Sequence, residues 1–322
     1  IGIDECEIVT VEKKTTTVRI TDSEIVEIKQ NFDKKYGIRI IHQKKIVSIQ
    51  TTDSQNIEKD IDNIFETISN FKPREFWKGL PYKVSARKIE GTFDDRLEEI
   101  SGKNSMDIAQ SMINSADNEK INTITGSLNI VSEDFQLRNS QGLEFNDKAT
   151  YVSGIINAES EQGNIPVSGI GHASGRTLSN FSKEQIGEDA KIMCIESINP
   201  QKIESDTYPI IFEPYSVGEL LAFVVASNFN FKTFTEKKSC FSNKLKEEIG
   251  IKEFNLIDDP YAPEGIGTKS VDDEGVETQK KYLVEKGVFK NTFSNLFDSY
   301  KEGEQSTGNA SRPGSPMGRS SE

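Results

Sequence analysis

The chain has 322 residues, a formal net charge of −13 and a pI near 4.9, with 34% hydrophobic residues. This length fits one large domain or two, and the hydrophobic fraction suffices for a core. The acidic balance disfavours nucleic acid, because such binding relies on clustered Lys and Arg, and no basic stripe compensates. No apolar run reaches the length of a membrane span. We therefore expect neither nucleic acid nor a membrane as a partner.

The three cysteines, Cys6, Cys194 and Cys240, lie far apart in the sequence. An odd number of cysteines at wide spacing argues against a disulfide framework and favours a reducing compartment. We therefore expect a cytoplasmic protein in which each cysteine acts as a small hydrophobic residue.

The first part of the chain predicts strands followed by a helix. Partial alternation of apolar and polar residues over 7–12 and 15–29 indicates strands. The segments 37–42 and 45–49 indicate a hairpin with a tight turn between them. Apolar residues then recur at helical spacing, at Ile57, Ile61, Ile64, Phe65 and Ile68. The stretch 71–91, which contains two prolines and the only tryptophan, predicts a connector.

The middle of the chain predicts two helices on either side of a strand-rich run. Apolar residues on one face favour helices over 105–116 and 182–195. Between them, 121–168 alternates apolar residues with polar turns, and the sequence Asn-Ser-Gln-Gly at 139–142 is a strong turn signal. This part should therefore form a sheet of several strands with two helices.

The last part mixes short strands with helices. We expect a short buried strand at 208–212 and an apolar helix over 215–226. A strand at 254–257 should feed a tight hairpin at 282–289. Apolar residues over 293–300 favour a helix that Gly303 ends.

The histidines limit the chemistry, since there are only two, His42 and His172. A zinc peptidase places two histidines on one helix turn, as in H-E-x-x-H, and that pattern does not occur in this sequence. We expect His42 on a strand in a structural role and His172 in a flexible Gly/Ser loop at 168–175. The dinucleotide fingerprint, the P-loop and the G-x-S-x-G elbow are also missing from the sequence. We predict no catalytic, cofactor-binding or metal-binding residue.

An acidic loop precedes the predicted hairpin. Its carboxylates could hold a hard cation: Asp258, Asp259, Asp272, Asp273 and Glu274. The spacing of an EF-hand is not met, however, and glycines at 265, 267 and 275 suit a chain that bends between strands. Acids beside such turns accept backbone N–H bonds. The residues alone therefore favour a structural loop over a metal or catalytic loop.

Several short strings follow one another along nearly the whole chain. They are GIRII at 37–41, NSQGL at 139–143, KSCF at 238–241, LIDDP at 256–260, SVDDEGVET at 270–278, EKGV at 285–288 and STGNASR at 306–312. Together and in this order, they resemble the TldD/TldE family, also called PmbA or modulator of DNA gyrase.

The resemblance implies an α+β fold of two lobes. An N-terminal strand–helix unit at 1–72 and a strand-rich central unit at 73–200 would form the first lobe. A strand-rich C-terminal domain at 201–322 would form the second. Because family members continue beyond the STGNASR segment, we expect this domain to be incomplete and the first family helix to be missing.

The resemblance also implies a metallopeptidase system of two related subunits. TldD-like chains carry a zinc-binding H-E-x-x-x-H on a helix, whereas PmbA/TldE-like chains lack it. The corresponding region here, 214–230, has Glu219 as its only charged side chain. A lone Glu cannot hold zinc or activate a metal-bound water. This chain therefore resembles the subunit without the zinc motif, and zinc is expected in its TldD-like partner.

The resemblance thus predicts a non-catalytic subunit that acts with a TldD-like peptidase on peptides or unfolded proteins. Two motif loops would line a cleft or an interface: Asp272, Asp273, Glu274 and Gly275, with Thr307, Gly308 and Asn309. The simpler alternative is that these loops only hold turns. Two other functions stay open, a stand-alone binding or scaffold protein that forms a homodimer, and a gyrase-modulating protein without a peptidase role.

Overall fold

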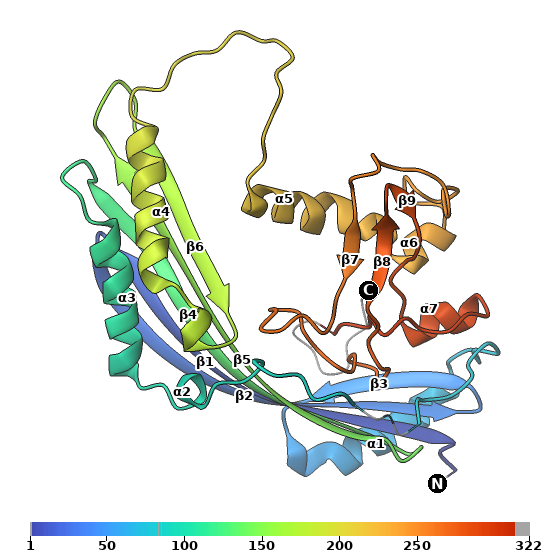
Figure 1. The fold of residues 1–322 in the computed structure, drawn as a ribbon. Helices are drawn as coiled ribbons and strands as arrows, with labels where there is room; N and C mark the ends of the chain where they lie inside the picture. The colour runs from blue at the N-terminus through green and yellow to red at the C-terminus, as the bar shows by residue number, and fades with distance from the viewer. Residues whose placement is uncertain (1, 83, 85, 313–322) are drawn as a thin grey trace.

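The computed structural model describes residues 2–82, 84 and 86–312, and a long antiparallel sheet of six strands dominates it (Figure 1). The strand order is β3-β2-β1-β4-β5-β6. The strands are β1 (Glu5–Thr21), β2 (Glu24–His42), β3 (Lys45–Thr51), β4 (Thr123–Asn139), β5 (Glu144–Ser160) and β6 (Val167–Gly175).

Tight turns set the register of this sheet. The pairs Asp22-Ser23 and Gln43-Lys44 have positive φ at both residues, which is the geometry of a two-residue hairpin turn. At the predicted turn 139–142, the Asn139 side-chain oxygen accepts from the N–H of Gln141 at 2.9 Å. β1 pairs with β4, so strands from the predicted first and central units share one sheet. The domain boundaries themselves stay a prediction.

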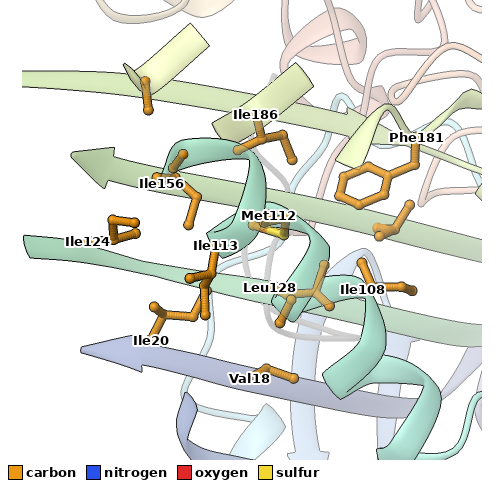
Figure 2. Close-up of a cluster of buried hydrophobic side chains, with 14 of the residues drawn as sticks. Val18, Ile20, Ile108, Met112, Ile113, Ile124, Leu128, Ile156, Phe181 and Ile186 are labelled. Atoms are coloured by element: carbon orange, nitrogen blue, oxygen red, sulfur yellow. The ribbon is translucent and has the colours of Figure 1, made fainter. Parts of the chain in front are cut away.

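Helices cover the sheet in two places. They are α1 (Ile57–Ile68), the short α2 (Asp95–Glu98), α3 (Gly102–Ala116) and α4 (Lys183–Glu196). α3 and α4 pack over β1, β4 and β5, where Met112 and Ile186 meet Leu128 and Ile156 (Figure 2). α1 packs near the β2–β3 hairpin, in a separate cluster that includes Ile64 and Ile38. The predicted helices in this part are confirmed.

The prediction of a flexible loop at 168–175 is wrong, because these residues form β6. A Cβ at Gly171 would lie 1.9 Å from the Ile186 carbonyl oxygen, and one at Gly169 would lie 2.2 Å from the backbone of α4. The glycines therefore allow α4 to approach the strand closely rather than letting the chain bend. His172 is consequently held on a strand.

The remaining chain forms a smaller second part. It contains α5 (Pro214–Leu220), which continues through η3 (Leu221–Val225) and η4 (Ala226–Phe229), then α6 (Phe231–Thr235), β7 (Leu256–Asp258), β8 (Lys281–Glu285), β9 (Val288–Phe289) and α7 (Leu296–Lys301). β7, β8 and β9 form a three-stranded sheet. Leu283, Val284 and Phe289 from this sheet pack on Phe229.

The predicted buried strand at 208–212 is also wrong. These residues form no strand, and Ile211 is 96% exposed. A short apolar run becomes a buried strand only where a neighbouring strand can pair with it, and none of the described strands does so.

The α+β class itself is confirmed. Among the described residues, no helix is long and apolar enough to cross a membrane.

Candidate functional site

The acidic loop reaches the junction between the six-stranded sheet and the second part of the chain. At its centre, the N–H of Asp272 donates to the Val276 carbonyl at 2.8 Å, and the N–H of Gly275 donates to the Asp272 carbonyl at 3.1 Å. Gly275 has a φ of +85°, where a side chain would be strained. Residues 272–276 therefore make a tight turn whose carboxylates point into the protein.

Asp272 organises this turn from within, and only 2% of it is exposed. Its carboxylate accepts from the backbone N–H of Glu274 and of Val276, both at 2.9 Å, and of Ala310 at 3.0 Å. Burial, and then the negative charge of Glu274, raise the pKa of Asp272 to about 7, although the backbone hydrogen bonds oppose this. The acid thus ties the first motif loop to Ala310, which directly follows Asn309 of the second motif loop.

Glu274 belongs to a buried cluster of four charges. Its Oε1 accepts from both terminal nitrogens of Arg39 at 3.3 Å, and its Oε2 accepts from the N–H of Leu296 at 2.8 Å. Arg312 donates to Oε1 of Glu7 at 3.1 Å and lies 3.6 Å from Glu274. Two acids thus face two arginines, from β1, β2 and two C-terminal segments. We call these four residues, Glu7, Arg39, Glu274 and Arg312, the seam cluster.

Asp273 and the second motif loop complete this junction. Asp273 forms an ion pair with Lys269 and accepts from the N–H of Arg312 at 2.7 Å. Gly308 has a φ of +70°, and a Cβ there would lie 2.2 Å from the Glu277 carbonyl oxygen. This position therefore admits only glycine without a shift of the backbone.

Thr307 and Asn309, on either side of Gly308, hold polar contacts of their own. Thr307 Oγ1 accepts from the N–H of Ser294 at 2.7 Å. The Asn309 side-chain amide donates to Asp258 at 2.8 Å, and its oxygen accepts from Lys281 at 2.6 Å. The structure therefore brings all seven motif residues together, engaged with their own chain. A contact with another chain or a ligand stays a prediction.

Several cavities border this junction. One, of about 570 Å³, lies beside residues 86–93 and 145–148 and does not involve the motif acids. A larger one, of about 750 Å³, lies between β2, the connector and α7, and its lining includes Arg39, Glu274, Trp77 and Phe297. Gly275 lines a further cavity of about 530 Å³. These volumes are in the range of ligand pockets, roughly 300–1,000 Å³.

Sequence reasoning did not single out Glu7, Arg39 or Arg312 as a site. Glu7 and Arg39 are directly opposite each other on β1 and β2, both in segments that are otherwise rich in apolar residues. Two opposite charges inside such segments are a signal for a buried pair, since unpaired charges are rarely buried. Their register became visible only in the paired strands.

The segment 214–230, which would correspond to the helix with the zinc motif, carries other side chains. α5 carries Glu219, whose carboxylate accepts a hydrogen bond from the Tyr215 hydroxyl. This bond raises the pKa of Tyr215. The ring of Tyr215 lies against His172 of β6, with 3.8 Å between centroids. Among the described residues, no group of three or more His, Cys, Asp or Glu is placed to hold a metal ion. The side chains around α5 therefore do not fit a zinc site, which needs at least three protein ligands.

Comparison with known proteins agrees with the motifs. Residues 6–70 match the family model described as PmbA/TldA metallopeptidase domain 1, and residues 205–321 match the PmbA/TldA metallopeptidase C-terminal domain.

Two relatives extend over most of the chain. An uncharacterised protein of Methanocaldococcus jannaschii is 25% identical over 311 residues, which cover 96% of this chain and 71% of that protein. A protein of Buchnera aphidicola, named as a homologue of the metalloprotease PmbA, is 23% identical over 316 residues, covering 92% and 68%.

The fold has a solved counterpart. The crystal structure of TldE from Thermococcus kodakarensis superimposes with a TM-score of 0.89 at 21% identity, covering 97% of this chain and 72% of that chain. At this identity the superposition shows a shared fold. Together with the two matching domain models, it shows that this chain belongs to the PmbA/TldD family.

Proposed function

We propose that this chain is a PmbA/TldE-like subunit of a TldD/TldE-type zinc metallopeptidase complex, without a catalytic zinc site of its own. Its partner would be a TldD-like subunit that holds the zinc, and the substrates would be peptides or unfolded proteins. In this proposal, residues 1–72, 73–200 and 201–322 correspond to three family domains. The three free cysteines support a reducing, cytoplasmic setting.

The positions of the histidines carry this proposal. His42 lies on β2 and His172 on β6, and the strand order places β1, β4 and β5 between them. Four inter-strand spacings of about 4.8 Å put the two histidines at least roughly 19 Å apart across the sheet. Zinc–nitrogen bonds are about 2.0–2.1 Å long, so one ion cannot bind both imidazoles.

An exposed apolar surface supports a role in binding another chain. On α5 and η3, Leu220 is 42% exposed, Phe223 82% and Val224 60%. Exposed apolar patches of this kind mark sites for proteins or peptides. The seam cluster fixes the second part of the chain on the sheet, and α5 meets β6 through Tyr215 and His172. The surface would thus be held in a set position.

Peptide hydrolysis with an unfolded protein substrate tests the proposal. The full chain is assayed alone and in an equimolar mixture with the H-E-x-x-x-H paralogue of the same organism, with and without a chelator. We expect hydrolysis by the mixture above that of the paralogue alone, and loss of it with the chelator. Phe223→Asp should reduce this gain, whereas Ile251→Asp, a control at an exposed apolar residue elsewhere, should not.

Two outcomes would contradict the proposal. Chelator-sensitive hydrolysis by this chain alone would mean that it binds a catalytic metal. No gain in the mixture, together with no binding between the two chains, would favour a stand-alone scaffold protein.

A further inference from the structure

The cavity of about 750 Å³ lies between β2, the connector at residues 71–91, and α7. We call it the connector cavity. It lies where α7 faces the β3 end of the large sheet (Figure 1). Its lining includes four aromatic side chains, Phe71, Phe76, Trp77 and Phe297. Sites for small organic ligands combine such an apolar lining with a few polar groups that orient the ligand.

Contacts within the chain hold these aromatic rings in place. Phe76 packs edge to face on Phe297, with 5.1 Å between the ring centroids. Trp77 packs on Tyr300 at 5.5 Å, and its Nε1 donates to Oε1 of Glu5 at 3.3 Å. The aromatic lining is therefore fixed before any ligand arrives, which lowers the cost of binding one.

The three acids that line the cavity already accept hydrogen bonds. Glu274 accepts from Arg39 at 3.3 Å within the seam cluster. Glu236 accepts from Lys238 at 2.6 Å. Asp298 accepts from the side-chain amide of the N-cap residue of α7 at 3.1 Å. A cationic ligand would gain little from these acids, because each already has a donor in the chain.

Arg74 supplies the cavity with a positive charge of a different kind. Among the described residues, no carboxylate forms an ion pair with Arg74, whose guanidinium carbon lies 5.7 Å from the ring centroid of Phe297. Lys301 also lines the cavity, and its Nζ lies 3.8 Å from Glu302 in an exposed pair. Exposed ion pairs contribute little. Both cations can therefore donate to a bound anion.

The lining carries more cations than acids, although the chain as a whole has a net charge of −13. Four cations face the three acids, namely Arg39, Arg74, Lys232 and Lys301. Their charge acts on Glu236, whose pKa is lowered chiefly by the hydrogen bond from Lys238 and further by the charges of Lys232 and Lys301. The cavity therefore favours a ligand with a negative charge.

We propose that the connector cavity binds a small organic acid, whose apolar group packs on Trp77 and Phe297 and whose carboxylate pairs with Arg74. An arginine can donate two parallel N–H bonds to a carboxylate, which gives both affinity and orientation. Two sources carry such a carboxylate, a free small acid and the last residue of a peptide. The proposal concerns a site apart from α5 and does not rest on the proposed peptidase partnership.

The fluorescence of Trp77, the only tryptophan in the chain, reports on this cavity directly. Titration with N-acetylphenylalanine should give a saturable change with a dissociation constant in the millimolar range or below. N-acetylphenylalaninamide has the same ring without the charge, so it should bind at least about tenfold more weakly. A tripeptide that ends in phenylalanine separates the two sources, because it binds equally well only if peptide ends fit the cavity.

A pair of substitutions on the connector tests the role of Arg74. Arg74→Gln should raise the dissociation constant of N-acetylphenylalanine at least about tenfold, because the carboxylate loses a charged donor. The matched control Lys72→Gln removes the same charge from an exposed connector residue that does not line the cavity, and should leave the affinity unchanged. Lys301→Gln should weaken binding by less than Arg74→Gln. Circular dichroism checks that each variant folds.

Four results would overturn the proposal. They are a lack of saturation up to about 10 mM, equal affinity for the acid and its amide, an unchanged affinity in folded Arg74→Gln, and tighter binding of phenethylamine. The last result would mean that the acids of the lining, rather than Arg74, select the ligand.

Discussion

Two regions within the second part of the chain show opposite relations between polarity and burial. In the turn at 272–275, Asp272 and Glu274 are 2% and 1% exposed, whereas Ile211 and Phe223, before and after the start of α5, are 96% and 82% exposed. The acids are buried because backbone N–H groups donate to them and because Arg39 and Arg312 form ion pairs with Glu274. Burial here therefore follows the available partners rather than the hydropathy of the residue.

The largest expected effect comes from removing a partner of the buried acids. Arg39→Leu leaves Glu7 and Glu274 with one fewer cation in a buried site. We expect the free energy of unfolding to fall by about 3–5 kcal/mol, the usual cost of breaking a buried ion pair from one side. Urea denaturation measures it.

The matched control is Arg19→Leu, since Arg19 forms an exposed pair with Glu27 and has a side chain that is 63% exposed. This change should alter stability by less than about 1 kcal/mol. Equal effects from the two substitutions would mean that the seam cluster does not hold the two parts of the chain together.

The burial of Asp272 predicts a dependence of stability on pH. Its pKa rises from 3.8 to about 7 on folding, so the folded state binds the proton more tightly than the unfolded state. This contribution is fully present below about pH 4 and is lost as the pH rises towards 7. Between pH 5 and 7, the stability of the native sequence should fall by up to about 3 kcal/mol relative to Asp272→Asn.

Urea denaturation of both proteins at several pH values measures this difference. A difference that stays constant from pH 5 to pH 7 would mean that Asp272 is ionised throughout this range. In that case its backbone hydrogen bonds and the nearby arginines would outweigh the effect of burial.

Backbone geometry at the second motif loop predicts a smaller loss. Gly308→Ala combines a positive φ with a Cβ that would overlap the Glu277 carbonyl oxygen. We expect a loss of about 2 kcal/mol, measured by thermal or urea unfolding. At Gly102, in the first turn of α3, a Cβ meets nothing within 4 Å, so Gly102→Ala should be neutral or slightly stabilising.

The local features of this fold could be predicted from the sequence, whereas the contacts between distant segments could not. The turn at 139–142 and the helix at 57–68 follow from turn chemistry and apolar spacing. The hairpin turn at Asp22-Ser23 lacks the strong Asn-Gly signal, so it lies inside a segment that the sequence predicts as strand. Gly171 looked like part of a loop because its close neighbour, Ile186, is known only once α4 packs on β6.

The site too could be predicted from the sequence only where it is local, because its contacts join distant segments. Family strings marked the loops at 272–275 and 307–309, and the structure shows that Asp272 and Asp273 bind Ala310 and Arg312, which follow the second loop. Glu7 is separated from Arg312 by 305 positions, so no local pattern could join them. Burial of an acid depends on such distant partners, and composition and periodicity do not report them.

The smallest expected effect belongs to the exposed apolar residues. Ile211→Ser and Phe223→Ser remove little buried surface, so each should change the free energy of unfolding by no more than about 0.5 kcal/mol. Phe229→Ala, in η4 of the same segment, should cost about 3–5 kcal/mol because Phe229 is 1% exposed and packs on Phe289. A large loss from Ile211→Ser would mean that this segment is buried in solution. The apolar segment would then be covered by partners, as the acids of the turn at 272–275 are. The contrast between buried acids and exposed apolar residues would no longer hold.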